Sequence, residues 1–277
     1  MQRLLLIALA TQLAVHAQVR FVDPPVHAES GMPYLTTTMD GKTYLAWTEP
    51  AAIEKEHAIR LSRWTGSDWT APETVAQGKN WFVNWADFGT LIVQPDGSML
   101  AHWLTRSGAG AKFGYGIRIA KRAPDKPAWR EVHGMSLDEQ TDYAGFLSFV
   151  PNGAGAIYLS PPPHNDHAAA PANGHGDSHD HRKTVRFISF RKDGTVESDQ
   201  EVDSDACSCC PTTIGRTRSG LVAAYRDHLP GEIRDIAIIR QVNGKWTEPK
   251  TLHADGWKIN ACPTDGPSLV SKEDRVA

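Results

Sequence analysis

One short pattern recurs four times along the chain and limits its fold more than any other feature. Each copy is an apolar run, a tight turn and a second apolar run, with the turn at Asp40-Gly41, Asp96-Gly97, Asn152-Gly153 or Ser219-Gly220. Glycine supplies the positive φ angle that such hairpin turns need. The turn glycines at 41, 97, 153 and 220 are 56, 56 and 67 residues apart. This spacing predicts a repeat architecture in which each unit packs against the next.

Each hairpin is followed by a second pair of predicted strands. In the first repeat these strands cover residues 58–62 and 74–75, and in the fourth residues 236–239 lead through Asn243-Gly244 to Trp246. Four strands in each unit, without helical periodicity, are typical of a β-propeller blade. A β-sandwich would explain the density of strands but not their regular spacing. We therefore predict an all-β protein, a β-propeller with about four and a half blades in this chain.

Composition and the N-terminus set the compartment. The 277 residues are 40% hydrophobic and 22% charged with a net charge of −3, so no nucleic-acid partner is expected. Arg3, an apolar run over 4–10 and Val15-His16-Ala17 are typical of a signal peptide over residues 1–17, cleaved near Ala17. No later apolar run is long enough to span a bilayer. We expect a single secreted or periplasmic domain over residues 18–277, where cysteines can pair.

One segment carries a family resemblance. Residues 62–69 resemble the Asp-box of sialidase-like (BNR-repeat) propellers, Ser/Thr-x-Asp-x-Gly-x-x-Trp, with Ser62, Gly66 and Trp69 kept and Trp64 in place of the aspartate. More eroded copies surround Trp129 and Trp246. The resemblance covers about residues 30–277 and implies that the box caps the hairpin between the third and fourth strands. It also implies six blades when complete, so we expect a C-terminally truncated propeller.

The resemblance also bears on activity. It implies an arginine at the start of blade one that grips a substrate carboxylate in a bidentate pair. Gly31-Met32-Pro33 stands at that place, with glycine where the arginine belongs. The implied function is a diverged exo-α-sialidase or glycosidase homologue, or a glycan-binding protein that lacks the usual first arginine. Its partner would be a glycan or glycoconjugate.

Propeller geometry brings several charged residues to one end of the molecule. The first strand of each blade starts at the same end as the loop that joins its second and third strands. We expect candidate catalytic residues at this end in blade four, where ion pairs that brace the loop are an equal alternative: Arg226, Asp227, Arg234 and Asp235. Candidate ligand-binding residues are Trp257, whose ring would suit a sugar face or pack between blades, and Asp87 and Asp142 before blades two and three.

All four cysteines lie at the same predicted end. They are Cys207, Cys209, Cys210 and Cys262, and Cys-Pro-Thr occurs at both 210–212 and 262–264. A disulfide between Cys210 and Cys262 would join neighbouring blades and is the interpretation that we favour for an exported chain. The alternative is a thiolate site for copper or zinc that includes all four cysteines.

A histidine-rich insertion accounts for the longer third interval. Residues 161–183 contain His164, His167, His175, His179 and His181 among small and polar residues. Such tracts bind divalent metals, although a solvated low-complexity loop is an equal alternative. The second function class is therefore an extracytoplasmic protein that binds copper or zinc through its cysteines and this loop.

Overall fold

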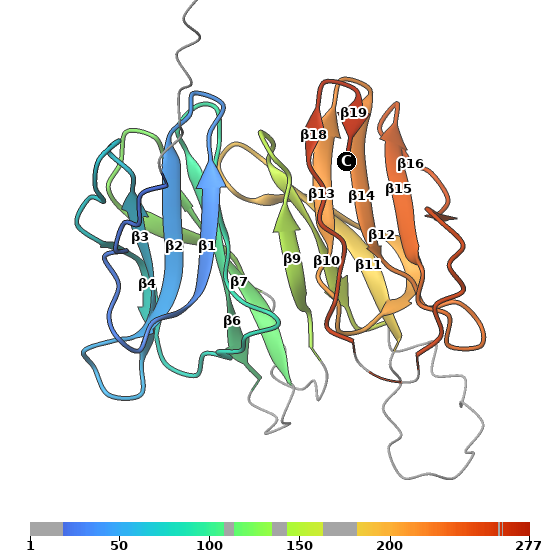
Figure 1. Ribbon diagram of the computed structural model, residues 1–277, viewed down its shortest axis with the longest axis horizontal. Helices are drawn as coiled ribbons and strands as arrows, with labels where there is room; N and C mark the ends of the chain where they lie inside the picture. Colours follow the sequence, from blue (N-terminus) through green and yellow to red (C-terminus); the bar gives the residue numbers. More distant parts are fainter. Residues whose placement is uncertain (1–18, 108–113, 135–142, 163–181, 260, 262) are drawn as a thin grey trace, which may run out of the picture.

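The structure is a computed structural model that describes residues 19–107, 114–134, 143–162, 182–259, 261 and 263–277. Within these ranges the chain forms antiparallel β-sheets and no helix (Figure 1). No helix that could cross a membrane is found among the described residues. The predicted all-β class is confirmed.

Four sheets of successive strands stand next to one another along the long axis of the view (Figure 1). The first contains β1 (Gly31–Thr37), β2 (Thr43–Pro50), β3 (His57–Arg63) and β4 (Glu73–Gly78). The second contains β5 (Leu91–Val93), β6 (Met99–Arg106), β7 (Tyr115–Arg122) and β8 (Trp129–Gly134). The third contains β9 (Gly145–Phe149), β10 (Gly155–Ser160), β11 (Arg182–Phe190) and β12 (Val196–Cys207). The fourth contains β13 (Thr213–Thr217), β14 (Gly220–Arg226), β15 (Ile236–Val242) and β16 (Lys245–Trp246), with β17 (Lys250–Thr251) also paired to β15. Each is one blade of the predicted propeller, and we number the blades one to four.

A two-stranded hairpin follows blade four. It consists of β18 (Ser271–Lys272) and β19 (Arg275–Val276) and lies beside β13 (Figure 1). The Arg216 backbone N–H donates to Ser271 Oγ at 3.0 Å, and Ser219 Oγ donates to Asp274 Oδ1 at 2.9 Å. These contacts place the hairpin where the strands of a further blade would begin.

The predicted hairpin turns lie between the first and second strands of every blade. Gly41, Gly97 and Gly220 have positive φ angles, and in the third turn Asn152 takes that conformation instead. The segment 62–69 connects β3 to β4 as the Asp-box resemblance implied, and Trp64 and Trp69 pair across it with their ring centroids 5.2 Å apart.

The strands are apolar on both faces because each blade packs against two neighbours. In β10, Ala156 and Tyr158 belong to the core shared with blade two, whereas Ile157 and Leu159 belong to the core shared with blade four. Alternate residues of a strand point to opposite faces, so a continuous apolar run serves two interfaces. A third core joins blades one and two.

The histidine-rich insertion is shorter than expected at its C-terminal side. We expected residues 161–183 to form a loop, but β11 begins at Arg182 and pairs with the long strand β12. Lys183 is buried and its Nζ donates to the Tyr143 carbonyl oxygen at 3.1 Å, over the Tyr143 ring. A buried lysine with these partners belongs to the blade and not to a solvated loop.

Candidate functional site

The first strands begin, and the second strands end, at the lower end of the sheets in Figure 1, which we call the mouth end. Three segments in and beside blade four lie at this end: the end of β12 with the connection to β13, the loop between β14 and β15, and the segment after β17. An isolated pairing of Ala206 with Asp227 joins the first two, and one of Ile233 with Lys258 joins the last two. These contacts bring the three segments together at the mouth end.

Three cysteines form a buried cluster at the mouth end. The sulfur atoms of Cys207, Cys209 and Cys210 all lie within 4.8 Å of one another, and none of the three is more than 7% exposed. Cys209 is disulfide-bonded, whereas Cys207 and Cys210 carry free thiols with their Sγ atoms 3.4 Å apart. The expected disulfide through Cys210 is therefore not what the structure shows. Cys262 lies outside the described residues.

The two free thiols differ in their electrostatic surroundings. The hydrogen bond from Cys210 lowers the pKa of Cys207 to about 6, and Arg234 Nη1, which donates to Cys207 Sγ at 3.2 Å, acts in the same direction. The same bond and burial raise the pKa of Cys210. A thiolate at Cys207 that accepts from a Cys210 thiol is the arrangement that these contacts favour.

Arg234 is a buried anchor of the site. It is 3% exposed, and besides the Cys207 contact its Nη2 donates to Glu232 Oε2 at 2.6 Å. Its Nε lies buried without a hydrogen-bond partner. Asp235 next to it accepts the backbone N–H groups of Gly256 and Trp257 at 3.0 and 2.8 Å. Asp235 thus braces the segment after β17 through hydrogen bonds from backbone N–H groups, and its catalytic role stays a prediction.

Arg226 holds Trp257 at the surface. The guanidinium carbon lies 4.3 Å from the centroid of the Trp257 ring, and Arg226 also donates to the carbonyl oxygens of Arg234 and Asp265 at 2.6 Å each. Trp257 remains 37% exposed. Cation–π contact fixes one face of an aromatic ring and leaves the opposite side for other partners.

A row of ionisable groups continues from Asp227. Burial raises the pKa of Asp227 to about 6, and its Oδ1 accepts the His228 backbone N–H at 2.8 Å. The His228 ring bonds Asp205 at 2.9 Å and lies 3.5 Å from Glu232, and the Asp205 contact raises its pKa. The Arg234 hydrogen bond holds the pKa of Glu232 below its usual range. These surroundings favour the protonated form of the Asp227 carboxyl group and the ionised form of the Glu232 carboxyl group.

Asp87 lies before β5, the first strand of blade two, but its side chain is buried from solvent. It is 2% exposed, and its Oδ2 accepts from Tyr115 Oη at 2.8 Å and from the Phe146 backbone N–H at 3.0 Å. Burial raises its pKa to about 7. Asp87 therefore links blade two to blade three, and its predicted ligand-binding role stays a prediction.

Several predicted residues lie outside the described residues. They are Asp142, Cys262, His164, His167, His175, His179 and His181. The sequence analysis missed Glu232 and Asp205, whose only signal was their charge close to His228. It also missed Glu49 in blade one, which is buried and accepts from Trp47 Nε1 and Arg60 Nε at 2.7 Å each.

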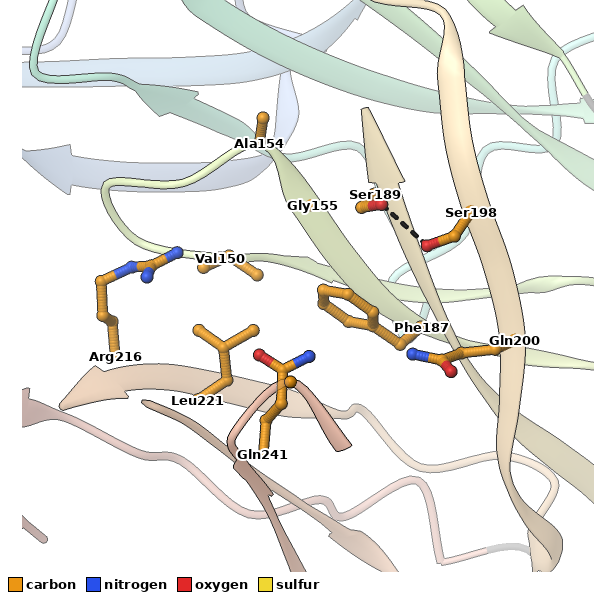
Figure 2. A pocket seen from close by; sticks show the side chains of 11 residues that line it. Val150, Ala154, Gly155, Phe187, Ser189, Ser198, Gln200, Arg216, Leu221 and Gln241 are labelled. Carbon is orange, nitrogen blue, oxygen red and sulfur yellow. Dashed lines mark hydrogen bonds between the residues drawn. The ribbon is translucent and has the colours of Figure 1, made fainter. Parts of the chain in front are cut away.

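A pocket of about 440 Å³ opens between blades three and four at the opposite end of the sheets (Figure 2). Phe187, Leu221 and Val150 form its apolar part, and Gln200, Gln241, Arg216 and the hydrogen-bonded pair Ser189 and Ser198 supply polar groups. None of the described residues that line it carries a carboxyl group. Acid–base chemistry is therefore better supported at the mouth end.

The fold is also found in solved structures, although no protein-family model and no curated protein matches the sequence. An α-L-arabinofuranosidase from Fusarium graminearum superposes with a TM-score of 0.50 at 10% identity, over 81% of this chain and 66% of that one. An α-L-arabinanase of Penicillium chrysogenum, complexed with arabinobiose, gives 0.49 at 14% identity, over 78% and 63%. An endo-arabinase from Bacteroides thetaiotaomicron gives 0.46 at 13% identity, over 81% of each chain.

The superposition on the Fusarium protein, taken with the four-stranded sheets, indicates a β-propeller fold. The chain spans less than two thirds of the length of the Fusarium and Penicillium proteins. The predicted propeller fold is thereby confirmed. At this level of identity the likeness concerns the fold alone.

Proposed function

We propose that this protein is an exported, carbohydrate-directed β-propeller, diverged from sialidase-like glycosidases, that binds a glycan at the mouth end of blade four. The observation that carries the proposal is the Trp257 ring, held by Arg226 on one side and 37% exposed. An exposed aromatic ring with one face fixed offers a stacking platform for the apolar face of a sugar.

The neighbouring carboxyl groups supply the elements of glycoside hydrolysis. A glycosidase pairs a carboxylic acid that protonates the leaving oxygen with a carboxylate that acts as base or nucleophile. Asp227, whose pKa is about 6, has the properties of the acid, and Glu232, whose pKa is lowered, has those of the carboxylate. His228 lies between them, bonded to Asp205. We assign the acid role to Asp227 and the base role to Glu232.

The proposed substrate class follows from the residue at the start of blade one. Gly31 has no side chain to pair with a substrate carboxylate, so the proposal favours neutral sugars over sialic acid. Arabinose-containing oligosaccharides are the first to test, because the Fusarium protein is named an α-L-arabinofuranosidase and the Penicillium protein an α-L-arabinanase.

The test measures binding and turnover over a panel of arabino-oligosaccharides and sialosides. We expect binding of at least one neutral oligosaccharide, and loss of at least tenfold in affinity for Trp257→Ala. Asp227→Asn and Glu232→Gln should keep binding while any release of reducing sugar falls by at least a hundredfold. Turnover should show a decline above about pH 6, where Asp227 loses its proton.

Trp64→Ala is the matched control, because Trp64 lies in the hairpin between β3 and β4 of blade one, away from blade four. It should bind the oligosaccharide as the native chain does. Equal loss in both tryptophan variants, or turnover of a sialoside in preference to every neutral sugar, would contradict the proposal.

A further inference from the structure

We propose that Cys207 and Cys210 form a binding site for a single cuprous ion, next to the proposed glycan site and joined to it through Arg234. The two residues stand in a Cys-x-x-Cys arrangement, Cys207-Ser208-Cys209-Cys210, at the end of β12. Their Sγ atoms face each other at 3.4 Å and each residue is 1% exposed. Two preassembled, buried thiols with no disulfide between them are ligands that a soft monovalent ion prefers.

The contact between the two sulfurs marks the place of the ion. A hydrogen between Cys207 Sγ and Cys210 Sγ bridges the pair in the metal-free protein. A cuprous ion that enters would replace this bridging proton, bind both sulfurs as thiolates and release that one proton to solvent. The protein donates both electron pairs, and no oxidation state changes.

Charge balance favours a monovalent ion. Two thiolates and one cuprous ion carry a net charge of −1, and Arg234 lies against this group with Nη1 3.2 Å from Cys207 Sγ. A buried charge is tolerated when an opposite charge and hydrogen bonds accompany it. Arg234 is itself buried, so its guanidinium supplies the balancing charge.

The ligand set disfavours zinc. Zinc sites in proteins take four ligands in tetrahedral geometry. Among the described residues, no histidine or carboxylate joins the cysteines within the 4.8 Å that the three sulfurs span. Cys209 is disulfide-bonded, which leaves two thiols for the ion. Two thiolates suffice for a cuprous ion but not for a zinc ion.

The experiment titrates the full purified chain with cuprous ion under anaerobic conditions, without added reductant, against the chelator bicinchoninate. We expect one ion per chain, and a loss of at least a hundredfold in affinity for Cys207→Ser and for Cys210→Ser. Arg234→Met should weaken binding at least tenfold, whereas Arg234→Lys, which keeps the charge, should weaken it less. Ser208→Ala is the matched control, because it lies between the two cysteines and leaves both thiols in place.

X-ray absorption of the copper-loaded native chain makes the test independent of whether the variants fold. Two sulfur neighbours around the copper would support the proposal. Nitrogen or oxygen neighbours in place of sulfur, tight binding that survives Cys207→Ser, or displacement of the cuprous ion by an equal amount of zinc would overturn it. So would a disulfide joining Cys207 to Cys210 in the native protein as purified, found by peptide mapping.

Discussion

Asp87 shows how much of this molecule depends on single buried groups. Its carboxyl group joins blade two to blade three through Tyr115 and the Phe146 backbone, in a place that water hardly reaches. Burial raises its folded-state pKa from 3.8 to about 7. Between these values the folded protein binds a proton that the unfolded chain has released. This group therefore makes the free energy of unfolding fall as the pH rises from about 4 to about 7.

Asp87→Asn should remove this dependence while the amide oxygen still accepts the same two hydrogen bonds. We expect the stability of the variant relative to the native chain to increase with pH across this window, by up to about 1.4 kcal/mol per pH unit. Urea unfolding at pH 5, 6, 7 and 8 measures it. Asp96→Asn is the control, because Ser98 lowers the pKa of Asp96 and the trend should not appear. A constant difference across these pH values would show that Asp87 is ionised in the folded protein.

At the scale of elements, the approach to β13 is tied to the preceding blade. Thr212 lies just before β13, and its Oγ1 donates to the Phe146 carbonyl oxygen of β9 at 2.7 Å. In return, Ser148 Oγ of β9 donates to the Thr212 carbonyl oxygen at 2.6 Å. This reciprocal pair positions the segment that carries the cysteine cluster.

Thr212→Val should cost about 1–3 kcal/mol of unfolding free energy, because it keeps the shape and removes a hydrogen bond at a site only 3% exposed. Denaturant unfolding measures the loss. Thr37→Val offers the comparison, since Thr37 bonds Thr43 on an exposed strand pair and should change stability by no more than about 0.5 kcal/mol. Similar losses in both variants would mean that the link between β9 and the segment before β13 contributes nothing specific.

At the scale of the whole molecule, the blades share their cores. Each described interface between consecutive blades has one apolar cluster that draws residues from both. Ile157 of β10 is fully buried in the cluster that blades three and four share. A blade in this arrangement has no core of its own, so neighbouring blades should lose structure together.

Ile157→Ala should lower the free energy of unfolding by about 2–5 kcal/mol through the lost burial and the cavity it leaves. Hydrogen exchange is expected to accelerate in β14 and β15 of blade four as well as in β10 and β11 of blade three. Ile53→Ala, at a position 53% exposed, serves as the control and should leave exchange in both blades unchanged. Faster exchange confined to blade three would contradict shared stability.

The sequence by itself determined the strands, their turns and the end of the molecule where the site would lie. These follow from local chemistry, because Gly41, Gly97 and Gly220 fix turns and a strand apolar on both faces must be covered on both. The spacing of the repeats also predicted that Arg226, Asp227 and Arg234 lie at the same end of the molecule as the cysteines.

Only the tertiary structure decided how these side chains pair. The sequence treats Cys207, Cys209 and Cys210 as equals, yet the fold leaves Cys207 and Cys210 facing each other and gives Cys209 to a disulfide. It also placed Lys183 in a buried strand and set Glu232 against Arg234. Distances of a few ångströms between loops depend on how whole blades pack, and no pattern within one segment encodes them.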